Sequence, residues 1–204
     1  NFRNLEKSGK IHRTFLLYTQ PSNQMKMNKQ DLMDMHAIQA LTDADMQKVN
    51  QAILAQINSD VPMVNQLGFY IVQGGGKRIR PALYLLATKS NPNLDKDYVM
   101  PLAMALEMIH TASLVHDDVL DNAATRRGSA TANAKWGNNI AVLTGDYLFA
   151  KAFKIVSEMT NMKYLQVFSH IITCLVEGEF MQMEDVYRID QGIERYMTKT
   201  QKKT

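Results

Sequence analysis

The stretch HTASLVHDDVLDNAATRRG, residues 110–128, places three aspartates at the end of an apolar helical run and two adjacent arginines just after them. Residues four apart on a helix share a face, so Asp117 and Asp121 point the same way, with Asp118 beside them. Carboxylates crowded in this way repel one another unless a cation lies between them. The helix macrodipole also disfavours acidic groups at a helix C-terminus.

Hard oxygen ligands of this kind suit Mg²⁺, which takes few carboxylates together with water and substrate phosphates. The acidic cluster therefore indicates a site where magnesium bridges the protein to a phosphorylated ligand. The alternative is a solvated helix end, and the cluster alone does not decide between the two.

A basic segment lies at residues 74–81, GGGKRIRP. Three glycines let the backbone approach a ligand closely, and Lys77 and Arg80 share a face if a helix begins there. His110 lies two helical turns before Asp117 on the same face. Taken singly, these features also fit a linker, exposed basic pairs and a core histidine. Together with the arginines at 126 and 127, whose planar forks match phosphate oxygens, they indicate a substrate with diphosphate heads and a hydrocarbon body.

The composition excludes several other classes of protein. The chain has 204 residues, 46% of them hydrophobic, which suits one domain with a sizeable core. A net charge of +3 without a basic face argues against nucleic-acid binding. One cysteine, Cys174, rules out an internal disulfide framework and suits a reducing compartment. We expect no membrane span and no signal peptide, because no apolar run approaches ~18–20 residues.

Helical periodicity dominates the chain, and glycine and proline are sparse. We expect a helix capped by Thr42, followed by helices over 61–73, 80–90, 97–121, 138–159 and 162–186. The last of these is apolar nearly all round, which predicts a central place in the fold. The fold class is therefore all-α: an antiparallel helix bundle spanning residues 25–204, after a poorly ordered extension over residues 1–24.

Several motifs in order along the chain resemble those of the trans-isoprenyl diphosphate synthases, and within them the long-chain, octaprenyl-like group. They are NQLGFYIVQGGGKRIRP, IHTASLVHDDVLDNAATRRGSATAN, GDYLFAKAF and EGEFMQM, and the resemblance runs from about Asp43 to the last residue. It implies an isoprenoid-synthase-type bundle that joins isopentenyl diphosphate to an allylic diphosphate such as farnesyl diphosphate, with Mg²⁺ as cofactor. It also implies a homodimer whose product becomes the side chain of a respiratory quinone. Because we find no export signal, we expect a cytoplasmic location.

The resemblance also implies roles for individual residues. The three aspartates would hold magnesium on the allylic diphosphate, and Arg126 would contact that diphosphate directly. The isopentenyl diphosphate contacts would be Lys77, Arg80, His110 and Arg127. Further substrate contacts would be Gln182, Lys203 and Thr204. Lys199 and Thr200 compete with Lys203 and Thr204 for the family's Lys-Thr step, and the spacing from Gln182 favours the later pair.

Product length can be approached from helix geometry. Ala112 and Ser113 lie about one turn before Asp117, where a growing hydrocarbon chain would pass. Both side chains are small, whereas short-chain members of the family carry a bulky aromatic residue there. We therefore expect an open tunnel and a medium or long product.

The chain departs from the family at its carboxyl side. No second aspartate-rich motif follows, and Glu184, Asp185 and Asp190 do not form one. We therefore expect a bundle truncated at the C-terminal side and weak or absent activity of the chain alone. Two alternatives remain: an inactive fragment or partner subunit that binds diphosphates, and a class I terpene cyclase. The GGGKRIRP segment counts against the cyclase.

Overall fold

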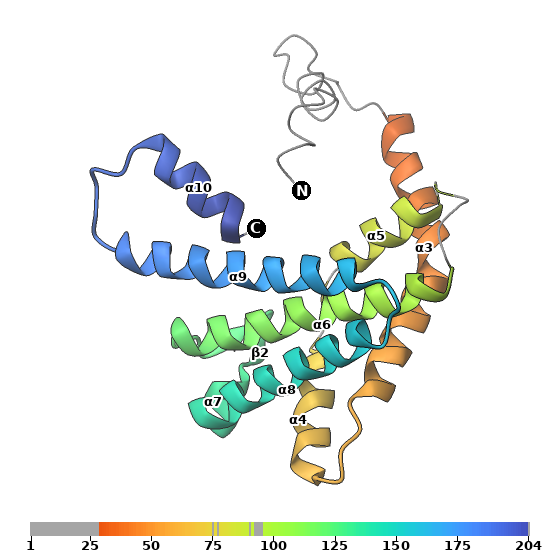
Figure 1. Ribbon diagram of the computed structural model, residues 1–204, viewed down its shortest axis with the longest axis horizontal. Helices are drawn as coiled ribbons and strands as arrows, with labels where there is room; N and C mark the ends of the chain where they lie inside the picture. Colours follow the sequence, from red (N-terminus) through yellow and green to blue (C-terminus); the bar gives the residue numbers. More distant parts are fainter. Residues whose placement is uncertain (1–28, 75, 77, 90, 92–95, 204) are drawn as a thin grey trace. The chain divides into compact units, whose positions relative to one another are not determined.

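The computed structural model describes residues 29–74, 76, 78–89, 91 and 96–203 (Figure 1). The chain divides into two compact units, Asn1–Leu41 and Thr42–Thr204. The extension expected over residues 1–24 lies outside the described residues. In the first unit the described residues belong to the start of helix α3 (Lys29–Gln56). The remaining description concerns the second unit.

The second unit is almost entirely helical, which confirms the all-α expectation. Its elements after α3 are α4 (Pro62–Gln73), α5 (Ile79–Lys89), α6 (Lys96–Leu120), β1 (Thr125–Arg126), β2 (Ser129–Ala130), α7 (Ala132–Trp136), α8 (Asn138–Ser157), α9 (Met162–Glu184) and α10 (Ile193–Lys203).

Local sequence explains several helix ends. Pro62 begins α4, where its missing N–H costs nothing, and the N–H of Gly74 bonds the carbonyls of Tyr70 and Ile71 at the other end. Helix α9 begins after Asn161, whose side chain accepts a hydrogen bond from Lys163 N over 3.1 Å.

The helix cap predicted at Thr42 is wrong. Helix α3 runs through Thr42, and this residue is only 3% exposed. Burial of Thr42 together with Val49 and Ile53 on α3 outweighs the local preference of threonine for a cap.

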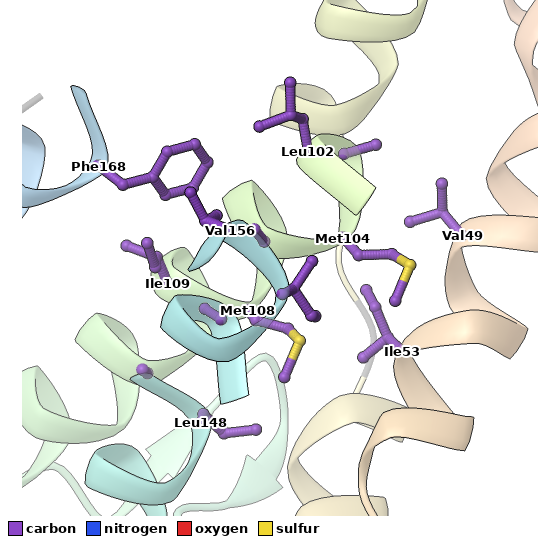
Figure 2. Packing of buried hydrophobic residues seen from close by; sticks show 14 of the residues in the cluster. Val49, Ile53, Leu102, Met104, Met108, Ile109, Leu148, Val156 and Phe168 are labelled. Atoms are coloured by element: carbon purple, nitrogen blue, oxygen red, sulfur yellow. The ribbon is translucent and has the colours of Figure 1, made fainter. Parts of the chain in front are cut away.

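The core forms around α6, against which α5 and α8 pack. Figure 2 shows side chains of α3, α6, α8 and α9 meeting in one cluster. Helices α6 and α8 approach closely at Gly145, where a Cβ atom would lie 2.2 Å from Nε2 of His116. The buried residues labelled in the figure are Val49, Ile53, Leu102, Met104, Met108, Ile109, Leu148, Val156 and Phe168.

Helix α9 differs from its prediction. We expected it to be central, but the only buried residues along it are Phe168 and Gly178. Val176 is 49% exposed and Phe180 is 63% exposed. Within the described residues, α9 packs against α8 and α10 and touches α6 through Tyr164 and Phe168, while side chains such as Val176 and Phe180 are not covered there. An apolar pattern all round a helix predicts that all of its faces are buried, but it does not predict which segments pack against them.

Helix α6 also bears on the membrane question. The segment Asp97–Leu120 is long and apolar enough to cross a membrane by length and composition, contrary to the sequence-based expectation. However, 56% of its most apolar window is buried inside the protein, and the core helix of a water-soluble protein passes the same test.

Candidate functional site

The three aspartates lie where α6 ends, but they do not face the same neighbours. Asp118 is 6% exposed, and Arg126 Nε donates to its Oδ1 over 2.8 Å. Asp117 is half-buried, and the positive charge of Lys203 acts on its carboxyl group. Asp121 is exposed just beyond the helix, and its N–H bonds the Asp117 carbonyl over 2.8 Å.

The arrangement of the acidic groups bears on whether a cation could bind here. No three acidic, histidine or cysteine side chains converge on one point as metal ligands in the described part of the chain. Burial nevertheless raises the pKa of Asp117, and the charges of Glu179 and Asp121 raise it further, while Lys203 and Arg126 oppose the rise. Crowded carboxylates with incomplete compensation fit a divalent cation, which would relieve their mutual repulsion.

Helix α10 brings one lysine towards the aspartates. Lys203 Nζ lies 2.7 Å from Oε2 of Glu179 and donates to Oε1 of Gln182 over 2.9 Å. Lys199 Nζ instead donates to Oδ2 of Asp185 over 3.0 Å. These contacts favour Lys203 over Lys199 as the lysine that acts on the site. Thr204 lies outside the described residues.

Glu179 was not singled out from the sequence, although it stands inside the EGEFMQM motif. Its side chain is 16% exposed and binds Lys203 on the side that faces the aspartates. A glutamate three residues before a candidate contact, Gln182, shares its helix face, and that spacing could have identified it.

The basic groups gather around His110. Arg80 Nη1 lies 3.1 Å from His110 Nε2. Burial, together with the smaller effects of the charges of Arg80, Arg127, Arg126 and Arg78, lowers the pKa of His110 to about 4. The ring is therefore neutral near pH 7, and Arg80 donates to it. Lys77, expected beside this pair, lies outside the described residues.

The residue after Arg126 turns the chain sharply. Arg127 has φ +52 at the tip of the β1–β2 hairpin, and Gly128 follows with φ +80. The guanidinium of Arg127 lies against Gly76, where a Cβ atom would come within 2.4 Å of its Nη1 atom. Glycine is therefore required at position 76 for this approach, as the glycine-rich segment suggested. The hairpin itself was not predicted.

A cavity of about 310 Å³ lies between α4, α6 and the hairpin. Its lining combines apolar residues such as Ile71 and Leu114 with Asp118, Arg126 and Arg127. It therefore adjoins the arginine hairpin on the side of α6 that carries Asp118.

Two charged residues of this lining were missed by the sequence analysis. Arg78 Nη1 donates to Oε1 of Glu107 over 2.6 Å, and its Nη2 donates to the carbonyl of Val72 over 2.7 Å. The pair is nearly buried, with side chains 13% and 6% exposed. It fixes the start of α5 on α6, and with it the placement of Arg80.

The two residues expected to set product length differ in their surroundings. Ala112 is fully buried in the core cluster around α6. Ser113 is half-buried, and its hydroxyl donates to the carbonyl of His110 over 2.8 Å. Both lie on the turn of α6 between His110 and Asp117.

Comparison with known proteins gives one consistent answer. The family model for polyprenyl synthetase matches residues 61–204. The octaprenyl diphosphate synthase of Haemophilus influenzae is 49% identical over 178 residues, which cover 87% of this chain and 54% of that protein. That of Escherichia coli is 44% identical over 172 residues, which cover 84% of this chain and 53% of that protein.

Solved structures agree. A polyprenyl synthase from Caulobacter crescentus, complexed with calcium and isoprenyl diphosphate, matches with a TM-score of 0.76 and 36% identity, over 82% of this chain and 51% of that one. A decaprenyl diphosphate synthase from Rhodobacter capsulatus matches with a TM-score of 0.77 and 32% identity, over 83% and 52%. The chain thus spans about half the length of the relatives it matches.

Proposed function

The chain belongs to the polyprenyl synthetase family, and from that premise we propose that it acts as an all-trans-polyprenyl diphosphate synthase, or as part of one. The reaction would join isopentenyl diphosphate to an allylic diphosphate, with an octaprenyl-like product. The observation that carries the proposal is the placement of two polar side chains along one face of α6, each near a basic group. His110 contacts Arg80. Asp117 lies about 10 Å further along the helix, and the charge of Lys203 acts on its carboxyl group.

This separation suits two diphosphate heads whose hydrocarbon parts meet between them. Lys77, Arg80, His110 and Arg127 would hold isopentenyl diphosphate. Neutral His110 would act as a hydrogen-bonding contact rather than as a second cation. The positioning of both substrates in one site reduces the entropic cost of bringing them together.

Asp117, Asp118 and Asp121 would hold Mg²⁺ on the allylic side. Bound there, it supplies charge neutralisation for a diphosphate group. Arg126, Lys203 and Thr204 would contact the same diphosphate, and Gln182 would orient Lys203 through their hydrogen bond. These fixed positive charges stabilise the negative charge that grows on the departing diphosphate.

In the reaction, the C–O bond of the allylic diphosphate breaks and the diphosphate leaves with the electron pair. The double bond of isopentenyl diphosphate supplies the electrons of the new C–C bond. Loss of one proton then restores a double bond. Farnesyl diphosphate is the expected allylic substrate, and small side chains at Ala112 and Ser113 would let the product lengthen beside α6.

The remaining expectations belong to the same proposal. Residues 25–204 would form part of the catalytic bundle, and the enzyme would work as a cytoplasmic homodimer, without a membrane span, in supply of a quinone side chain. A non-catalytic partner subunit is less well supported, because the relatives from Haemophilus influenzae and Escherichia coli carry the name of the synthase itself.

The test is incorporation of labelled isopentenyl diphosphate into an organic-soluble product, with farnesyl diphosphate and Mg²⁺. The wild-type chain should form product, and Asp117→Ala and Arg80→Ala should each abolish it. A folded chain that binds both diphosphates but forms no product would instead support an inactive fragment of the synthase or a partner subunit. A folded chain that binds neither would overturn the proposal.

A further inference from the structure

We propose that Asp185 is a positioning residue for the allylic diphosphate: it anchors helix α10 on α9 and thereby sets the place of the Lys203 ammonium. The inference rests on the proposed function, in which Lys203 contacts that diphosphate. Asp185 itself touches no substrate in this scheme.

Asp185 is the residue at which α9 ends, and its side chain is only 2% exposed. Both carboxylate oxygens bind α10. Arg195 Nε donates to Oδ1 over 2.5 Å, and Lys199 Nζ donates to Oδ2 over 3.0 Å. Arg195 and Lys199 are four residues apart, so they lie on one face of α10 and bind the same carboxylate. Gln191 Nε2 adds a bond to the Asp185 carbonyl over 2.9 Å.

Polar contacts dominate the docking of α10, and they also include the ion pairs of Lys202 with Glu177 and of Lys203 with Glu179 at its far end. None of its residues is buried, and large apolar side chains such as Tyr196 and Met197 are more than half exposed. Hydrophobic burial therefore contributes little to its docking. Arg195 extends the anchor by a further bond to Oε2 of Glu184 over 2.9 Å.

The far end of α10 meets α9 at a glycine. A Cβ atom at Gly178 would lie 2.9 Å from the backbone nitrogen of Lys203, so the last turn of α10 rests directly on the α9 backbone. Helices α9 and α10 run back alongside one another, as Figure 1 shows. Asp185 at one end and Gly178 at the other therefore fix both the direction and the depth of α10.

Asp185 also distinguishes the two lysines on this side of α10. Lys199 and Lys203 are four residues apart and share a face of α10. A hollow of about 460 Å³ between the two helices is lined by both lysines, Asp185 and Gln182. Asp185 holds the Lys199 ammonium at the end of α9, whereas the Lys203 ammonium binds Glu179 and Gln182 one turn of α10 further along, where its charge lowers the pKa of Asp117.

The test is a double-mutant cycle on the affinity for farnesyl diphosphate with Mg²⁺, measured by titration calorimetry without isopentenyl diphosphate. The variants are Asp185→Asn, Lys203→Met and the two combined. Asp185→Asn should weaken binding about tenfold in the wild-type background and less than twofold in the Lys203→Met background. Glu158→Gln, which removes a carboxylate from an exposed ion pair with Lys154, is the matched control and should change nothing.

A second readout separates positioning from general destabilisation. Affinity for isopentenyl diphosphate, whose proposed contacts lie on α5, α6 and the hairpin, should be unchanged by Asp185→Asn. If that variant loses its helical circular dichroism, Arg195→Lys takes its place, because it keeps the charge but loses the two-pronged geometry. The same pattern of affinities is then expected.

Equal weakening in both backgrounds, or no weakening at all, would overturn the role of Asp185 while leaving the proposed function intact. Failure of the wild-type chain to bind farnesyl diphosphate would contradict the proposed function itself, and the inference with it. The two failures are therefore distinguishable in a single set of titrations.

Discussion

Arg80 Nη1 lies 3.1 Å from Nε2 of His110, although 30 positions separate the two residues in the chain. A guanidinium group has no acceptor, so the histidine must accept through Nε2 and carry its proton on Nδ1. The contact therefore requires a neutral ring in the folded protein. Burial and the surrounding arginines agree with this, since together they lower the pKa of His110 to about 4.

The first prediction concerns the effect of pH on stability. The unfolded chain takes up a proton on His110 near pH 6.5, whereas the folded chain resists protonation down to about pH 4. The contribution of His110 is thus fully present above pH 6.5 and is lost as the pH falls between these values. Solvent screens a half-buried ring, so we expect a loss on the order of 1 kcal/mol.

Urea unfolding at pH 7 and pH 5 measures this loss. His110→Gln keeps a polar side chain that can accept from Arg80 but cannot titrate, so it should remove this part of the pH dependence. An unchanged pH dependence in His110→Gln would show that other groups are responsible for it.

The second prediction concerns magnesium and pH. Burial raises the pKa of Asp117, and Glu179 and Asp121 add to the rise, so this carboxyl holds its proton to a higher pH than an ordinary aspartate. Protons should therefore compete with Mg²⁺ at Asp117, and affinity should fall as the pH is lowered. Calorimetry with Mg²⁺ and farnesyl diphosphate at a series of pH values measures the effect.

Asp117→Asn should bind Mg²⁺ more weakly and lose the pH dependence of the affinity. A steep pH dependence retained in this variant would count against Asp117 as the group that competes for protons.

The helices were predictable because periodicity and caps are local properties. Pro62 and Gly74 mark the two ends of α4, and the bounds of α6, α8 and α9 follow from apolar spacing alone. The failure at Thr42 arose because burial in the core, a tertiary effect, overrode a local preference. The central place expected for α9 failed for a similar reason, since a helix pattern does not reveal whether its partners lie within the same stretch of chain.

The candidate site divides in the same way. The clusters at 74–81 and 117–127 were visible as runs of charge, and the structure places Arg80 against His110 and Arg126 against Asp118. Arg78 and Glu107 are 29 positions apart in the chain, so no local sequence pattern predicts their ion pair. Spacing in the sequence favoured Lys203, but only contacts show that Lys199 is bound by Asp185.

The third prediction tests the nearly buried pair of Arg78 and Glu107. Glu107→Leu should destabilise the protein by about 3–5 kcal/mol, because it leaves the Arg78 charge buried without its partner. The double variant Arg78→Met with Glu107→Leu should recover part of that loss, since it removes both charges. Urea unfolding measures both changes.

The exposed pair of Lys154 and Glu158 provides the control, and Glu158→Gln should cost less than about 0.5 kcal/mol. If Glu107→Leu costs no more than that control, the buried pair does not anchor α5.

The fourth prediction concerns the contact of Arg127 with Gly76. In Gly76→Ala the new Cβ atom would meet Nη1 of Arg127 at 2.4 Å, so the guanidinium must move away from the glycine-rich segment. Affinity for isopentenyl diphosphate should fall about tenfold, while affinity for farnesyl diphosphate with Mg²⁺ should stay within twofold, because the contact proposed for Arg127 is with isopentenyl diphosphate alone. Alanine at φ +155 also strains the backbone, which costs on the order of 1–3 kcal/mol of stability.

Gly137→Ala separates the two effects: it introduces alanine at φ +89 with no atom within 4 Å of its Cβ. That control should lose stability but keep its affinity for isopentenyl diphosphate. Equal losses of affinity in both variants would assign the effect to backbone strain rather than to Arg127.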